Sequence, residues 1–208
     1  MANDDFAQGL RPINWPQPSG HYYRVQTGAD LFLGMPCALD STGYVGPIGV
    51  TSAGYFSFLG SVCWFAGTLK RGLATNDPFL DVSDLTPPDP SSDTGDRYVF
   101  VADDPNQEFV IQGDSGGTMA GVANAGEAAV MLYRATSGNT NTGWANLELD
   151  ASTNVATTAG LVHLIRLHDV VNQDGTENTG AVAYTKWVVK VLSHQRGGIQ
   201  APNLNIVV

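Results

Sequence analysis

The sequence predicts a mainly β protein: a small β-barrel or sandwich-like core with extended N- and C-terminal arms and one short helix. Charged residues make up 14% of the chain, against roughly 25% in an average soluble domain, while glycine is abundant with 24 residues. Short β-prone runs recur between turn residues, and no window carries a sustained apolar stripe of helical period. The 208 residues suit one domain, which can bury roughly 70% of the unfolded surface.

Residues 1–20 are predicted to form an extended N-terminal arm. Three prolines interrupt this stretch: Pro12, Pro16 and Pro18. Proline fixes φ and lacks a backbone donor, so neither a helix nor a central strand fits here. Ile13 and Trp15 lie between the prolines, and apolar anchors on an extended segment favour docking on a neighbouring surface. Ile13 and Trp15 are therefore candidate partner contacts.

The core domain is expected over residues 21–195, as short strands separated by turns such as 27–30 and 41–43. The predicted strands are Tyr22–Gln26, Pro36–Asp40, Gly60–Ala66, Tyr98–Asp103, Glu108–Gln112, Ala128–Tyr133, Trp144–Asp150, Leu161–Leu167 and Tyr184–Leu192. In the last of these, large apolar residues recur at every second position, which is the period of a strand.

The middle of the core carries a predicted hairpin. Tyr98–Asp103 is apolar on both faces, which indicates an interior strand. Residues 104–107 read Asp-Pro-Asn-Gln, with proline at the second position of a turn, so Glu108–Gln112 is expected to return as the hairpin partner. One short helical turn is expected over Thr118–Asn124.

Two further segments are expected outside the strands. The loop at 71–96 carries four of the eleven prolines and most of a run of eight aspartates between Asp77 and Asp104. Because it lacks EF-hand spacing, we interpret it as a solvated acidic loop rather than a calcium site. The C-terminal tail, residues 196–208, ends in three apolar residues that need something to pair with. These residues, Ile206, Val207 and Val208, complete the candidate partner contacts.

Residues 113–117 read Gly-Asp-Ser-Gly-Gly, like the nucleophile loop of chymotrypsin-like serine proteases, where Ser115 would attack and Gly113 would supply an oxyanion-hole amide. A serine nucleophile needs a histidine base that a carboxylate orients. The only histidine before Ser115 is His21, in a His-Tyr-Tyr context instead of Ala-Ala-His-Cys, and too few residues precede the motif for that family's first barrel. The sequence therefore predicts a glycine-rich turn and no catalytic residue.

Other combinations of reactive residues also fail to form a site. His163 and His168 are five positions apart, so on a strand they face opposite ways and are not expected to bind a metal together. Cys37 and Cys63 lack CxxC spacing and are expected to be buried free thiols, although the sequence leaves a single disulfide open. The four tryptophans are interpreted as core or interface anchors rather than sugar platforms. No cofactor is expected.

Charge limits the partners. The net charge is −10 with a pI near 4.5, and the ten cations are scattered, whereas phosphate binding needs clustered Lys and Arg. Neither nucleic acid nor an anionic membrane is an expected partner. No apolar run reaches the roughly 20 residues of a membrane span, and no secretory signal is recognisable at the N-terminus, so we expect synthesis in a cytoplasm.

In order along the chain, several short features resemble the capsid decoration (cement) proteins of tailed bacteriophages. They are Tyr23-Arg24-Val25, Asp103-Asp104-Pro105-Asn106 with Glu108-Phe109, the short element over Thr118–Asn124, Lys186-Trp187, Lys190-Val191 and His194-Gln195. The resemblance covers roughly residues 22–195 and leaves the two arms and the 71–96 loop unexplained.

The resemblance implies a structural virion protein without catalytic residues, which sits on the outside of an HK97-type capsid and cements neighbouring major capsid subunits. It also implies self-association, as a trimer or alternatively a dimer. Another virion appendage, such as a fibre or receptor-binding module, is the alternative, and a serine hydrolase using Ser115 is a distant one.

Overall fold

A computed structural model describes residues 6–26, 29–48, 58–66, 98–115, 125–126, 128–155, 162–169, 175–177, 183–192 and 194–196. Within these residues all regular structure is β-strand, which confirms the mainly β prediction. The predicted short helix at Thr118–Asn124, the 71–96 loop and the tail beyond Arg196 lie outside the described residues.

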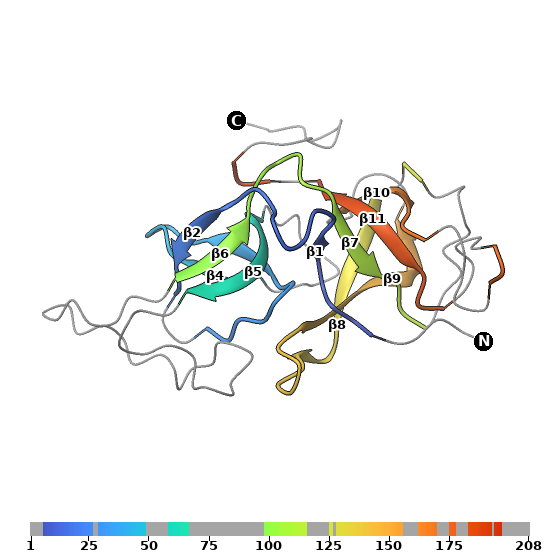
Figure 1. Cartoon of the computed structure of the whole chain (residues 1–208), viewed down its shortest axis with the longest axis horizontal. Helices are drawn as coiled ribbons and strands as arrows, with labels where there is room; N and C mark the ends of the chain where they lie inside the picture. Colours follow the sequence, from blue (N-terminus) through green and yellow to red (C-terminus); the bar gives the residue numbers. More distant parts are fainter. Residues whose placement is uncertain are drawn as a thin grey trace, which may run out of the picture.

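The strands form two antiparallel sheets, which Figure 1 shows as two lobes side by side. The six-stranded sheet has the order β1 (Arg11–Pro12), β7 (Phe109–Gln112), β11 (Lys186–Val191), β10 (Val162–Leu167), β8 (Ala128–Gly138) and β9 (Ala145–Val155). The five-stranded sheet has the order β2 (His21–Arg24), β6 (Tyr98–Ala102), β5 (Gly60–Ala66), β3 (Pro36–Leu39) and β4 (Val45–Pro47).

Both sheets curl until strands from their two sides meet. In the five-stranded sheet, Val25 at the end of β2 bridges to Val45 of β4. In the six-stranded sheet, Gly113 just beyond β7 bridges to Leu149 of β9. Closure of this kind pairs backbone groups that an open edge would leave exposed. Each lobe is therefore a sheet that closes on itself, within the mainly β class predicted from the sequence.

The interior strand predicted at Tyr98–Asp103 is confirmed as β6, which lies between β2 and β5. Its alternation separates two faces: Val99 and Val101 are fully buried, whereas Tyr98 and Phe100 are partly exposed on the opposite face.

The predicted hairpin between β6 and β7 is wrong. β6 already pairs with β2 on one side and β5 on the other, while β7 pairs with β1 and β11 in the other sheet. The turn itself is present, because the Gln107 amide donates to the Asp104 carbonyl at 2.9 Å. It carries the chain from one lobe to the other. All four residues of β7 are buried, so the strand suits a covered position better than a solvated hairpin.

The N-terminal segment differs from an arm outside the core. Leu10 is fully buried between the lobes: its amide donates to the Gly34 carbonyl at 2.8 Å, and its carbonyl accepts from the Ser61 hydroxyl at 2.6 Å. The next two residues form β1 on the edge of β7, where a proline is tolerated because an edge strand leaves some amides unpaired. The apolar Leu10 draws this segment into the seam between the two sheets.

A second connection crosses the seam. Leu33, which precedes β3, donates its amide to the Gly143 carbonyl, and its carbonyl accepts the amide of Ala145 at the start of β9, both at 2.8 Å. Buried side chains of the two sheets accordingly form one continuous core. Within the described residues, no helix is long and apolar enough to cross a membrane.

Candidate functional site

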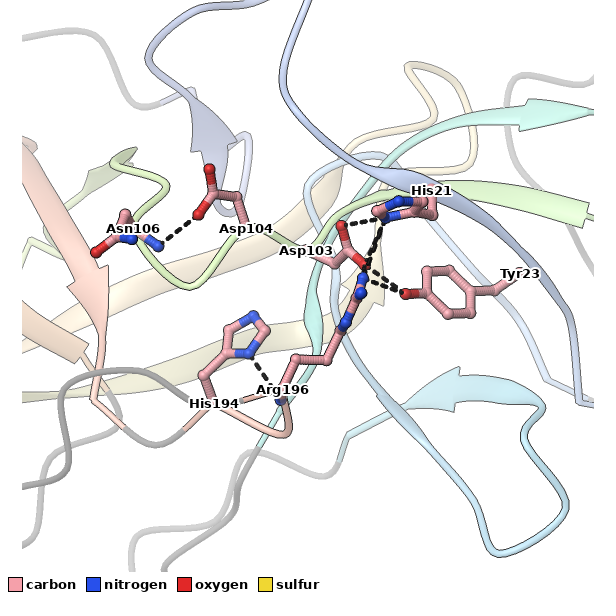
Figure 2. Close-up of polar contacts among 7 residues, drawn as sticks. All are labelled: His21, Tyr23, Asp103, Asp104, Asn106, His194 and Arg196. Atoms are coloured by element: carbon pink, nitrogen blue, oxygen red, sulfur yellow. Dashed lines mark hydrogen bonds and ion pairs between the residues drawn. The ribbon is translucent and has the colours of Figure 1, made fainter.

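A polar junction forms where three segments distant in sequence meet, at the start of β2, after β6 and beyond β11 (Figure 2). At its centre lies the Asp103 carboxylate, whose side chain is only 2% exposed. We call the set His21, Tyr23, Asp103, His194 and Arg196 the Asp103 junction.

Three side chains surround the carboxylate. His21 Nδ1 lies 3.0 Å from each carboxylate oxygen, and both the Tyr23 hydroxyl and the Arg196 guanidinium donate to Oδ2. The side chains of His21 and Arg196 are 64% and 46% exposed, so the partners themselves separate the carboxylate from solvent. A buried carboxylate is stable in this position because several donors replace its water.

The junction perturbs the acidity of its members. Burial alone would raise the pKa of Asp103, but hydrogen bonds from Tyr23, His21 and Arg196 outweigh it and leave that pKa below its usual value. Burial, with the Asp103 hydrogen bond, raises the pKa of Tyr23 to about 12. Burial lowers the pKa of His194, which favours its neutral form. At neutral pH the centre is thus a carboxylate held by neutral Tyr23 and cationic Arg196.

The junction fixes the segment that follows β11 onto the other sheet. His194 bridges to Phe58, and the Gln195 amide donates to the Phe58 carbonyl at 3.2 Å. The Gln195 side chain both accepts from the Leu39 amide, at 2.8 Å, and donates to the Leu39 carbonyl, at 3.1 Å. The Arg196 amide donates to His194 Nδ1 at 3.0 Å. Residues 194–196 therefore tie a strand of the six-stranded sheet to the five-stranded one.

The His21–Asp103 pair has the composition of the base-and-orienter pair of a serine hydrolase, and sequence reasoning missed it. Nothing in the local sequence around His21 indicates that Asp103, 82 positions away, would be its partner. Tyr23 and Arg196 share the carboxylate, however, and this network is the arrangement of a buried structural ion pair.

The Gly-Asp-Ser segment lies elsewhere. The Gly113 amide donates to the Thr185 carbonyl at 2.8 Å, and the Asp114 amide donates to the Leu149 carbonyl at 3.0 Å. Thr185 immediately precedes β11, whereas Arg196 follows that strand. Since β11 has six residues, at about 3.3 Å each, roughly 20 Å of strand separates Ser115 from the junction. Gly116 and Gly117 lie outside the described residues.

Five aromatic side chains form a continuous row at the surface, Tyr22, Phe100, Trp64, Trp15 and Trp144, which we call the aromatic row. Successive ring centroids are 5.1, 4.2, 6.0 and 5.6 Å apart. The Trp64 indole N–H donates to the Tyr22 hydroxyl at 3.1 Å. Tyr22 is 55% exposed, and the other four are partly exposed. Three of the four tryptophans thus lie at the surface, and Trp187 is buried in the core.

The candidate contacts of the N-terminal segment take different positions. Ile13 is 40% exposed, next to the β1 edge. Trp15 packs between Trp64 and Trp144 of its own chain, so it anchors the N-terminal segment to the domain. The remaining candidates, Ile206, Val207 and Val208, lie outside the described residues.

The remaining histidine and cysteine side chains in the described part of the chain show no sign of a functional site. His168 Nδ1 lies 2.6 Å from the carboxylate of its neighbour Asp169, and no group of metal-ligating side chains occurs among the described residues. Cys37 and Cys63 are both buried and unbridged, which confirms the thiol prediction. Burial raises the pKa of Cys63 to about 12, so this thiol is unreactive at neutral pH.

An open cleft of about 460 Å³ lies near one end of the aromatic row. Its lining residues are Asp30, Phe32, Ser137, Gly138, Asn139, Thr140 and Asn146. The first two precede β3, and the others belong to the β8–β9 hairpin, so the cleft lies between the two sheets.

Comparison of the chain with protein-family models, with curated proteins and with solved structures finds no match.

Proposed function

We propose that this chain is a structural virion protein that binds the outside of an HK97-type phage capsid and cements neighbouring major capsid subunits. One observation carries the proposal. The residues behind the resemblance to capsid decoration proteins are scattered in sequence, yet Tyr23, Asp103 and His194 converge on a single junction. Three residues of the resemblance therefore take part in one tertiary contact, which supports the proposal because short matches arising by chance have no reason to converge.

The junction also supports a role for the tail. Arg196 is held at Asp103, and the chain continues for twelve residues to Val208. An extended segment of that length spans at most about 40 Å, which is enough to reach a neighbouring subunit. An apolar end on a fixed stem suits strand addition to another sheet. Many weak contacts of this kind, repeated over a shell, stabilise the assembled state.

The serine hydrolase alternative loses support at Gly113. In that mechanism its amide must be free to bind the oxyanion, but here it donates to Thr185. The apolar side chain of Ile13 is exposed, so it could contact a capsid subunit, which supports the structural role instead. Self-association, as a trimer or alternatively a dimer, remains part of the proposal.

The test compares capsids that carry and lack the protein, heated in parallel with a dye that reports exposed DNA. We expect capsids without the protein to release DNA at a lower temperature, with little change in particle number before heating. Identical release curves would contradict cementing, and the appendage alternative would then be preferred.

The proposed capsid contacts are tested by measuring how much of each variant binds to capsids. Ile13→Asp and a chain ending at Gln200 should each decorate poorly, because both remove apolar contacts. Phe6→Asp is the matched control, since Phe6 is also an exposed large apolar residue, at 50%, and is not a predicted contact. Point substitution is preferable to deletion of the whole segment, because deletion would also remove the buried Leu10 from the seam. Full occupancy of both variants would contradict the assigned contacts.

A further inference from the structure

The aromatic row crosses from one lobe to the other. Tyr22, Phe100 and Trp64 come from β2, β6 and β5, where the register places Phe100 opposite both of the others. They share the face of the sheet opposite to the buried valines of β6. Trp15 of the N-terminal segment continues the row, and Trp144, just before β9, ends it on the six-stranded sheet.

The open cleft continues this surface beyond Trp144. Trp144 and Asn146 are two positions apart in extended backbone, so their side chains leave the chain on the same face, and Asn146 lines the cleft. The Asn139 amide donates to the Trp144 carbonyl at 2.8 Å, which holds the hairpin tip, with Thr140, against the same segment. The last ring of the row and the cleft thus share one face of the segment that begins β9, at the boundary between two sheets, which is a common location for ligand sites.

The row and the cleft carry little charge and combine aromatic side chains with polar ones. The row presents aromatic carbon, and the cleft is lined by two side-chain amides and two hydroxyls, from Asn139, Asn146, Ser137 and Thr140. Asn139 Oδ1 already accepts the backbone amides of Asn141 and Thr142, so Asn139 offers a ligand its NH₂ group. Among the residues of the row and the cleft, Asp30 is the one charged side chain. On a protein with a net charge of −10, this surface would not attract a phosphorylated or sulfated ligand.

The sequence favours core or interface anchors for the tryptophans, but three of them lie together at the surface. We propose that the aromatic row and the adjoining cleft bind a neutral carbohydrate chain. A pyranose ring offers apolar C–H faces that pack on aromatic rings and hydroxyls that pair with amide and hydroxyl side chains. An elongated row of rings ending in a polar cleft matches several sugar units in succession. The row lies on the face of β2 opposite to the Asp103 junction, because Tyr22 alternates with His21 and Tyr23. This activity goes beyond capsid attachment and does not depend on it.

The test uses the purified full chain and a panel of soluble neutral glycans: glucan, mannan, galactan and chitin oligosaccharides, with polyuronate as the anionic comparison. Titration calorimetry measures affinity, and tryptophan emission reports the row directly. We expect saturable binding of at least one neutral glycan with a change in emission, and no binding of polyuronate.

Two variants locate the site. Tyr22→Ala removes the most exposed ring and should weaken binding about tenfold, the effect of truncating an aromatic hot spot. Thr140→Ala removes a hydroxyl from the exposed hairpin tip and should weaken binding about fivefold, the effect of one lost hydrogen bond. Phe6→Ala is the matched control, because it removes an exposed ring outside the row, and it should bind like the wild type. Thr140 is exposed, so Thr140→Ala should keep the thermal unfolding midpoint of the control. Tyr22→Ala also loses the ring contact with Phe100 and the hydrogen bond from Trp64, so its midpoint should fall slightly. Binding is therefore compared at a temperature well below the midpoint of every variant.

The proposal is overturned if no neutral glycan binds, or if Tyr22→Ala and Thr140→Ala bind as tightly as Phe6→Ala. It is also overturned if the row mediates self-association instead, seen as a sedimentation coefficient that rises with concentration in the wild type and not in Tyr22→Ala, without glycan binding. Since this experiment needs no capsid, its failure is distinguishable from failure of the capsid proposal.

Discussion

The Asp103 junction and the Gly113–Ser115 segment lie at opposite ends of β11, and they differ in how their polar groups are used. In the Gly113–Ser115 segment, neighbouring residues spell a catalytic motif, but the amides of Gly113 and Asp114 bond to the backbone of neighbouring strands. In the junction, no contiguous motif exists, yet a buried carboxylate contacts three polar side chains from positions 21, 23 and 196.

The two regions differ because their polar groups have different origins. A glycine-rich stretch at a strand end is first of all backbone that must be hydrogen-bonded, and here barrel closure satisfies it. A carboxylate that folding removes from water must find donors wherever the chain can supply them, so its partners come from three separate segments. The Gly113–Ser115 motif can therefore be recognised in the sequence although the catalytic partners are missing. The Asp103 junction can be recognised only in the folded chain.

The largest effect is expected for Asp103→Ala, which removes the centre of the junction. Removing the carboxylate abolishes the hydrogen bonds from Tyr23 and Arg196 and the contact with His21. We expect the free energy of unfolding to fall by about 3 kcal/mol, the low end for a buried pair because His21 and Arg196 can turn to water. Urea unfolding measures it. Asp104→Ala is the control next in sequence: its carboxylate accepts one bond, from the Asn106 amide, so its loss should cost only about 1 kcal/mol. Equal effects at the two positions would contradict a central role for Asp103.

A smaller effect is expected at alkaline pH. The pKa of Tyr23 is raised from 10.0 to about 12 in the folded state, so the folded protein holds this proton more tightly than the unfolded chain does. The stabilisation is therefore fully present below pH 10 and is lost as pH rises toward 12. Tyr23→Phe should be less stable than the wild type below pH 10, and the gap should narrow above it. A gap independent of pH would show that folding does not raise the pKa of Tyr23.

The smallest effect is expected at Ser115. Ser115→Ala removes an exposed hydroxyl, so the free energy of unfolding should change by less than about 0.5 kcal/mol. A fluorophosphonate probe should leave Ser115 unlabelled in the folded protein, as judged by mass spectrometry. Labelling of Ser115 that Ser115→Ala abolishes would contradict the assignment of this segment as a turn, because it would show an activated nucleophile there.

Sequence alone determined the class of fold and much of the strand content. Gly60–Ala66 was predicted to the residue, and β6, β10 and β11 lie within one or two residues of their predicted ends, because alternation and turn residues are local signals. Buried free thiols were expected from composition and spacing, but the sequence left a disulfide open and the structure decided against it. The strand positions depend on interactions between residues close in the chain.

Tertiary structure alone decided which strands pair, where the N-terminal segment lies and what the polar residues do. The turn at 104–107 predicted a hairpin, but β6 had both neighbours already, so β7 joined the other sheet. Leu10 entered the seam because two sheets meet there and leave room for an apolar side chain. The Asp103 junction and the aromatic row required residues from β2, β6 and distant segments to converge. Pairing across long separations depends on burial and register in the whole chain, and no short stretch of sequence contains that information.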